Sequence, residues 1–236
     1  MSSSVLYRWP AAAKFGRTVP KAKFYEHATV SAVLRDQFVA TVQRITWAYK
    51  LADATIHLRG DEAVPEIQVF VIDAKDDDVS DDVLGAIDKA VRFPIIFEIN
   101  RGPEDARTTR MVAAHKNPGR QRQRVSTYFT TEWMDTDTPR APLPPALDLP
   151  TLYAALLTPI LPVQARPGER LSDAMDRVGQ ARKLEREIAS LEKRLRNEPQ
   201  FNRKVELRRE LRNRSAELDE LNSPEQSTNQ ESQWTS

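Results

Sequence analysis

Residues 66–99 read EIQVFVIDAKDDDVSDDVLGAIDKAVRFPIIFEI, and this stretch decides the fold class. Its first part, Glu66 to Ile72, is rich in β-branched and aromatic residues and predicts a strand. Acidic residues then precede apolar residues spaced three and four apart between Val83 and Val91, which predicts an amphipathic helix. Pro94 ends that helix, and Ile95 to Ile99 has the composition of a mostly buried strand. The stretch therefore indicates a domain that combines helices with a sheet.

The segment before this stretch predicts a helix and a first hairpin. From Ser31, which suits a helix N-cap, apolar residues recur mostly three and four apart as far as Leu51, so we expect one amphipathic helix. Ala54 to Leu58 is also β-rich, and the turn residues Arg59-Gly60-Asp61-Glu62 separate it from the strand at Glu66 to Ile72. We expect these two strands to pair as an antiparallel hairpin.

The segment after Ile99 predicts a second hairpin and a closing helix. Arg107 to Ala114 and Arg124 to Thr131 favour strand, with turn chemistry at Lys116-Asn117-Pro118-Gly119 between them. The proline-rich segment Asp135 to Pro150 predicts an extended connector over the surface, and the leucines from Leu152 to Leu161 predict a short apolar helix. The predicted fold is thus α+β, with a mixed sheet, two hairpins and packed helices.

The character of the chain changes at residue 166, where a narrow leucine seam begins. The seam is interrupted at Glu198-Pro199 and resumes in a second, more basic helix. Such a seam buries too little for a lone helix, so the two helices either fold back as a hairpin or continue and pair with another chain. We expect an α+β domain over residues 1–165, this helical segment over 166–222 and a disordered tail over 223–236. The candidate interaction residues are Leu184, Ile188, Leu191, Leu195, Phe201, Leu207 and Leu211.

Composition excludes several classes of protein. The chain has 236 residues, 35 basic against 34 acidic side chains, no cysteine and three histidines. The absence of cysteine rules out disulfides and thiolate zinc sites and fits a reducing compartment. No apolar run is long enough to span a membrane, and Met1 to Pro10 lacks the pattern of a signal peptide. We therefore expect a cytoplasmic protein with no membrane partner.

The pattern most typical of an enzyme is the end of the strand Val69 to Ile72, where Asp73-Ala74-Lys75 follows. Restriction-type nucleases use an acid and a lysine two residues apart, because the acid holds a divalent cation while the lysine orients water or stabilises charge. A further carboxylate is needed, and Glu66 is a weak candidate for it on the same strand. The alternative, which we favour, is a strand that runs out into a solvated acidic loop. Mg²⁺ is expected only if the nuclease interpretation holds.

Other catalytic patterns are missing from the sequence. It has neither of the usual glycine-rich phosphate loops and no Gly-x-Ser-x-Gly elbow. His27, His57 and His115 have no metal-ligand spacing, so we predict no metal site and no cofactor.

The second hairpin gives a nucleic-acid-binding signal. Basic residues cluster around its turn, and the aromatic residues Tyr128 and Phe129 follow. A basic ribbon with aromatics can track a phosphate backbone, although a charged, solvated tip that keeps a sheet edge soluble is the commoner explanation. The candidate residues are Arg110, Lys116, Arg120, Arg122 and Arg124.

Several strings together carry a family resemblance: FGRTVPKAKFY (15–25), QRITWAYKL (43–51), PEIQVF (65–70), AIDKA (86–90), PIIFEI (94–99) and QFNRKVEL (200–207). In these strings the chain resembles an uncharacterised bacterial family, the domain-of-unknown-function family numbered 4391. The resemblance implies no activity and no catalytic residues. It does imply gene neighbours that encode helicases and DNA methyltransferases of the restriction or phage-defence type.

The matching strings bring forward two groups of residues. In the first group, Glu66 can form a structural ion pair with Arg44 or Lys50. The second group stands at the break in the helical seam and either locks the turn, which we favour, or presents a surface to a partner; it comprises Gln200, Phe201, Asn202 and Lys204. Our leading hypothesis is a non-enzymatic accessory protein that docks onto a DNA-processing assembly, with a helicase or DNA methyltransferase as partner. The alternatives are the divalent-metal nuclease and a nucleic-acid-binding subunit.

Overall fold

The structure is a computed structural model, and it describes residues 5–27, 30–117, 124–125, 127–163, 166 and 169–223. The chain divides into two compact units, one that ends at Ile160 and one that begins at Leu161. The tail that we expect to be disordered lies, apart from Ser223, outside the described residues.

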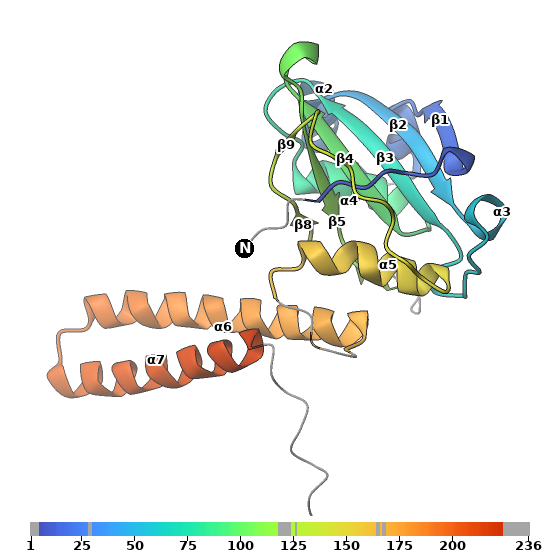
Figure 1. Cartoon of the computed structure of the whole chain (residues 1–236). Helices are drawn as coiled ribbons and strands as arrows, with labels where there is room; N and C mark the ends of the chain where they lie inside the picture. Colours follow the sequence, from blue (N-terminus) through green and yellow to red (C-terminus); the bar gives the residue numbers. More distant parts are fainter. Residues whose placement is uncertain are drawn as a thin grey trace, which may run out of the picture. The chain divides into compact units, whose positions relative to one another are not determined.

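The first unit contains a sheet, and the second a pair of long helices (Figure 1). The strands are β1 (Lys14–Thr18), β2 (Val42–Leu51), β3 (Ile67–Ala74), β4 (Ile95–Arg101), β5 (Thr108–Ala113), β6 (Lys116–Asn117), β7 (Arg124–Val125), β8 (Phe129–Thr130) and β9 (Met134–Asp135). The helices are α1 (Ala22–His27), α2 (Ala32–Thr41), α3 (Asp53–Ile56), α4 (Asp81–Ala90), α5 (Leu149–Leu157), α6 (Leu171–Asn197) and α7 (Phe201–Asn222), with short 3₁₀ turns at Ala11–Ala13, Glu104–Ala106 and Thr158–Ile160.

In the described part of the chain, seven strands form one mixed sheet in the order β1-β2-β3-β4-β5-β8, with β9 also paired to β5. Strands β3 and β4 are parallel and are joined through α4, whereas the other pairs are antiparallel. Helices α1, α2 and α4 pack on one face, where Phe38, Phe70 and Phe97 are buried in the main core. The predicted α+β class with a mixed sheet is confirmed.

Strand β2 corrects the single helix that we expected from Ser31 to Leu51. Ser31 does cap a helix, since its hydroxyl accepts a hydrogen bond from the Leu34 amide at 3.2 Å, but α2 ends at Thr41. The remaining ten residues form β2, in which two irregularities of register shift the phase of the strand. Its buried residues therefore fall three apart, at Val42, Ile45, Ala48 and Leu51, a spacing that imitates a helix.

The first expected hairpin is also wrong in its pairing. Strand β3 forms where we expected it, but its antiparallel partner is β2. Residues 53–56 form the short helix α3, because the Thr55 hydroxyl accepts from the Ala52 amide at 3.0 Å and donates to the Lys50 carbonyl at 2.8 Å.

The remaining expectations for the sheet unit hold. Helix α4 and strand β4 are confirmed, and α5 begins at Leu149 with Asp148 as its N-cap. The second hairpin is confirmed in the pairing of β5 with β8 and of β6 with β7. The strand expected over Arg124 to Thr131 is divided between β7 and β8.

The proline-rich connector is tied to the second face of the sheet by one buried carboxylate. Glu98 of β4 accepts hydrogen bonds from Trp9 Nε1 at 2.7 Å and from both terminal nitrogens of Arg140 at 2.7 and 3.0 Å. Arg140 also donates to the Tyr7 carbonyl at 2.8 Å, next to a bridge between Tyr7 and Ala141. The N-terminal segment and the connector thus run across the sheet together (Figure 1).

The second unit settles the open question about the leucine seam. Helices α6 and α7 lie side by side and fold back on each other at the turn 198–200 (Figure 1). Leu191 and Leu207 are buried in this pair, so α7 supplies the partner that the seam of α6 needs. At the open end, Arg177 donates to the Leu221 carbonyl at 2.9 Å and binds both carboxylate oxygens of Glu169 at 2.9 and 2.7 Å.

Candidate functional site

Asp73 is committed to a network that joins strands. It is 5% exposed, and its Oδ2 accepts a hydrogen bond from Arg44 Nε at 2.8 Å. The Nη2 atom of Arg44 lies 2.7 Å from the same oxygen. Its Oδ1 accepts from the Asn100 amide at 2.9 Å, and the Asn100 carbonyl oxygen accepts from the Thr109 hydroxyl at 2.8 Å. Both carboxylate oxygens therefore serve to link β2, β3, β4 and β5.

Glu66 and Lys75 lie away from this network. Glu66 pairs with Lys50 at 2.8 Å and accepts from Gln68 Nε2 at 2.5 Å, which confirms one of the two ion pairs expected for it. Glu66 directly precedes β3 and is seven positions before Asp73, which corresponds to about 23 Å along a strand. Lys75 donates to the Val39 carbonyl near the end of α2 at 2.6 Å. The structure does not bring these three side chains together, and the described residues contain no group of three or more metal-ligating side chains.

Lys116, one of the nucleic-acid candidates, is buried. Its side chain is 1% exposed, and its Nζ lies 3.1 Å from the Asp88 carboxylate. The same ammonium donates to the carbonyls of Asp88, Val91 and Phe93 at 2.7, 2.5 and 3.0 Å, where α4 ends. Burial raises the pKa of Asp88 and lowers the pKa of Lys116, while their mutual attraction opposes both shifts. Lys116 therefore closes a helix end and does not face a nucleic acid.

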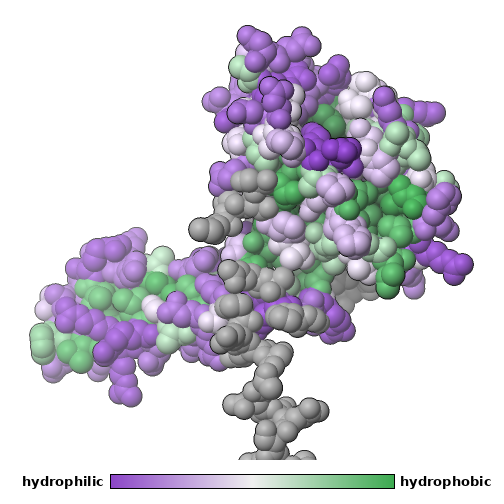
Figure 2. Space-filling view, in the orientation of Figure 1, coloured by the Kyte–Doolittle hydropathy of each residue, from purple (hydrophilic) through white to green (hydrophobic). Residues whose placement is uncertain are grey.

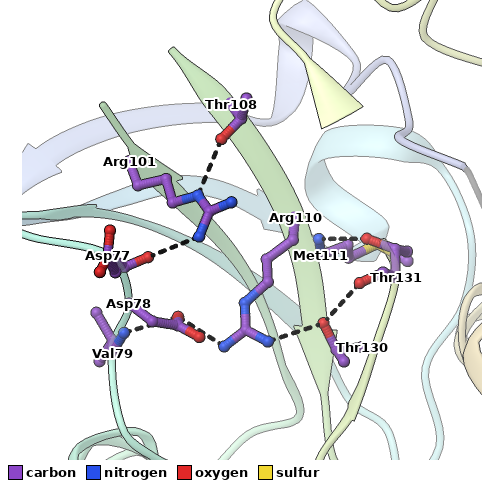
Figure 3. Close-up of polar contacts among 9 residues, drawn as sticks. All are labelled: Asp77, Asp78, Val79, Arg101, Thr108, Arg110, Met111, Thr130 and Thr131. Atoms are coloured by element: carbon purple, nitrogen blue, oxygen red, sulfur yellow. Dashed lines mark hydrogen bonds and ion pairs between the residues drawn. The ribbon is translucent and has the colours of Figure 1, made fainter. Parts of the chain in front are cut away.

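Arg110 belongs to a polar cluster at the end of β4 and β5 (Figure 3). It donates to Asp78 at 2.7 Å and to the Thr130 hydroxyl at 3.2 Å, and its side chain is 14% exposed. Arg101 donates to the Thr108 hydroxyl at 3.2 Å and to the Asp77 carbonyl at 3.4 Å. Arg101 and Arg110 both lie against the ring of Trp133, at 4.0 and 5.0 Å from its centroid.

Sequence reasoning missed Arg101 and Trp133 because their partners are far along the chain and no local spacing marks them.

Of the other basic candidates, Arg124 lies in β7 with its side chain outside the described set, and Arg120 and Arg122 lie outside the described residues.

The leucine candidates are internal to the hairpin. Leu191 and Leu207 are buried, and Leu184, Ile188, Leu195 and Leu211 are half-buried. These residues form the packing of α6 on α7, so they offer little surface to another chain.

The turn end of the hairpin is different. Phe201 and Val205 are 73% and 48% exposed and lie one helical turn apart on the same face of α7. Figure 2 shows green, hydrophobic residues at this end of the hairpin among purple, hydrophilic ones. The ring of Phe201 therefore does not lock the turn, contrary to the interpretation that we favoured. Glu198 restrains the turn instead, by accepting from the Gln200 amide at 3.0 Å.

Basic side chains surround Phe201 and Val205. Residues 192–209 contain seven lysines and arginines against three glutamates, a net charge of +4. We call Phe201, Val205 and the basic residues of this segment the hairpin tip; its basic members are Lys193, Arg194, Arg196, Arg203, Lys204, Arg208 and Arg209.

The model of one protein family, "Domain of unknown function (DUF4391)", matches residues 8–218, which include most of both units and the hairpin tip. The chain belongs to this family. No curated protein and no solved structure matches it. The description of the family names no activity, so the function of this member has to be argued from its own residues.

The family match confirms the resemblance to family 4391 that the sequence strings indicated.

No helix in the described ranges is both long and apolar enough to cross a bilayer.

Proposed function

We propose that this protein is a non-enzymatic docking subunit of a DNA-processing assembly, and that the hairpin tip binds the partner protein. The observation that carries the proposal is the exposure of Phe201 and Val205 at the end of a two-helix arm. Large apolar side chains that stand together in water are typical of interaction sites.

The energetics suit a docking role. A phenylalanine side chain has about 200 Å² to bury, so the exposed part of Phe201 is worth about 3–4 kcal/mol when a partner covers it. The positive charge around it favours a partner whose apolar socket is edged by acidic side chains, because complementary charge speeds association and excludes wrong partners.

The sheet unit supports the same proposal. Its buried carboxylates each hold a cation of the same chain: Glu66 with Lys50, Asp73 with Arg44, Asp88 with Lys116 and Glu98 with Arg140. Carboxylates paired in this way are neutralised within the fold, which leaves fewer groups for metal-dependent chemistry.

The partner class that we propose is a helicase or DNA methyltransferase of the restriction or phage-defence type. It rests on the gene neighbourhood that the family resemblance implies. A bacterial docking subunit of this kind works in the cytoplasm, where both enzymes meet DNA.

The test is co-expression of the tagged chain with a helicase and a DNA methyltransferase of the restriction or phage-defence type from the same genome. We expect one of them to co-purify at a fixed ratio. The double substitution Phe201→Ser, Val205→Ser should release it, whereas Val33→Ser, Val39→Ser should not, although Val33 and Val39 are 68% and 57% exposed. Co-purification of neither enzyme, or equal retention by both variants, contradicts the proposal.

The nucleic-acid-binding alternative now depends on Arg120, Arg122 and Arg124, because Lys116 and Arg110 are occupied within the fold. Charge reversal at those three positions tests it. Weaker retention of DNA at low salt, with a shallower dependence on salt, supports direct contact with phosphates.

A further inference from the structure

The sheet unit contains a pocket of about 330 Å³ on the face that carries α1 and α4. Seven of the ten residues that line it are apolar, and the others are Gln68 and the two cations Lys23 and Arg92. Its volume is at the lower end of the range for ligand pockets, which suits one bulky side chain better than a large cofactor.

The base of the pocket is formed by side chains that the fold holds firmly. Phe24, Gln68 and Phe70 are at most 4% exposed. Trp47 lies parallel to Phe70, with ring centroids 6.1 Å apart, and its other neighbour is Phe15 at 4.1 Å. An aromatic surface held in this way is preorganised, so a ligand does not have to order it.

Part of the pocket lining is fixed by the buried lysine. Val91 and Phe93 both line the pocket, and the backbone carbonyls of both accept hydrogen bonds from Lys116 Nζ. The backbone that carries these two lining residues is therefore held in place.

The polar groups of the pocket are largely used within the protein. Trp47 Nε1 donates to the Tyr49 carbonyl at 3.1 Å, and Gln68 Nε2 donates to Glu66 at 2.5 Å. A nucleobase would leave much of its hydrogen-bonding edge unpaired here, which is costly, whereas an apolar side chain loses nothing.

Both charged residues that line the pocket are cations. Lys23 and Arg92 are exposed, and none of the ten lining residues is acidic. An acidic residue next to the inserted apolar side chain would therefore be attracted to this site.

We propose that this pocket is a second docking site, which takes one bulky apolar side chain from an acidic peptide segment of a partner protein. It goes beyond the function proposed for the hairpin, because it lies on the sheet unit and uses different residues.

The probes for the test are fluorescein-labelled peptides with a single Leu, Phe or Trp flanked by Glu on both sides. The control peptides carry Ser at the centre or Lys at the flanks. Fluorescence polarisation with the full chain should show binding of the acidic apolar peptides and at least tenfold weaker binding of both controls.

Four variants locate the binding. Ala90→Phe fills the pocket and should abolish binding, with the melting temperature as a check on folding. Arg92→Glu should weaken it about two- to tenfold, whereas Arg196→Glu on the hairpin should have no effect. The hairpin-tip variant Phe201→Ser, Val205→Ser should bind the peptides normally, so this site and the hairpin tip can fail independently.

Equal polarisation for acidic apolar peptides and their serine controls overturns the proposal, and so does unchanged binding by a folded Ala90→Phe variant. Adenosine monophosphate or a short oligothymidine that binds in the pocket in place of the peptides also overturns it, because it identifies a nucleic-acid ligand.

Discussion

Replacement of Lys116 by methionine should destabilise the sheet unit strongly, because this lysine is a buried structural cation. The change removes an ammonium that lies 3.1 Å from the Asp88 carboxylate and satisfies three backbone carbonyls at the end of α4. Breaking a buried ion pair by removal of one partner costs about 3–5 kcal/mol, a large part of the total stability of an ordinary domain.

The pH dependence of this variant has a definite sign. Without Lys116, burial raises the pKa of Asp88 further, since the nearby positive charge that opposed the shift is gone. A carboxyl whose pKa is raised by folding favours the folded state at low pH and loses this contribution as the pH rises. The cost of Lys116→Met should therefore grow from acidic to neutral pH.

Urea denaturation followed by tryptophan fluorescence suits this test, since Trp9, Trp47 and Trp133 all lie in the sheet unit. The matched control is Lys89→Met, an exposed lysine in the last turn of α4, which should cost less than about 1 kcal/mol. The double variant Asp88→Asn, Lys116→Met should recover part of the loss. A Lys116→Met protein within about 1 kcal/mol of wild type at neutral pH refutes the reasoning.

Three further predictions concern other charged groups. Arg177→Leu should lower the unfolding free energy of the helical unit by about 3–5 kcal/mol in denaturation followed by circular dichroism, whereas the exposed Arg170→Ala should change it by less than about 1 kcal/mol. Hydrogen bonds from Arg177 lower the pKa of Glu169, so the stability of this unit should fall as the pH drops below the usual carboxyl range, and Glu169→Gln should flatten that fall. Millimolar magnesium should leave the melting temperature of the wild type unchanged and produce no DNA cleavage. A magnesium-dependent rise in melting temperature that disappears in the Asp73→Asn variant contradicts the structural role of Asp73.

The stretch from Glu66 to Ile99 could be read from its sequence because its strand and helix patterns are regular. Strand β2 could not, because its register irregularities place buried residues at helical spacing. The local pattern carries no sign of such an irregularity, which depends on the pairing of β2 with β3.

The candidate site was harder to predict for a related reason. Lys116 belongs to a basic run in the sequence. Only the fold shows that this one member reaches the end of α4, where its partner Asp88 lies 28 residues before it in the chain. The seam of the two C-terminal helices was clear from the sequence. The direction of their pairing, and with it the exposure of Phe201, depends on the turn geometry at 198–200.

The central claim, that the hairpin tip docks a partner, is tested most directly by photo-crosslinking. A benzoyl-phenylalanine placed at position 201 should crosslink to the co-expressed helicase or methyltransferase, and the same group at position 33 should not. Crosslinks from position 33 alone, or from neither position in a mixture that contains both enzymes, contradict the account.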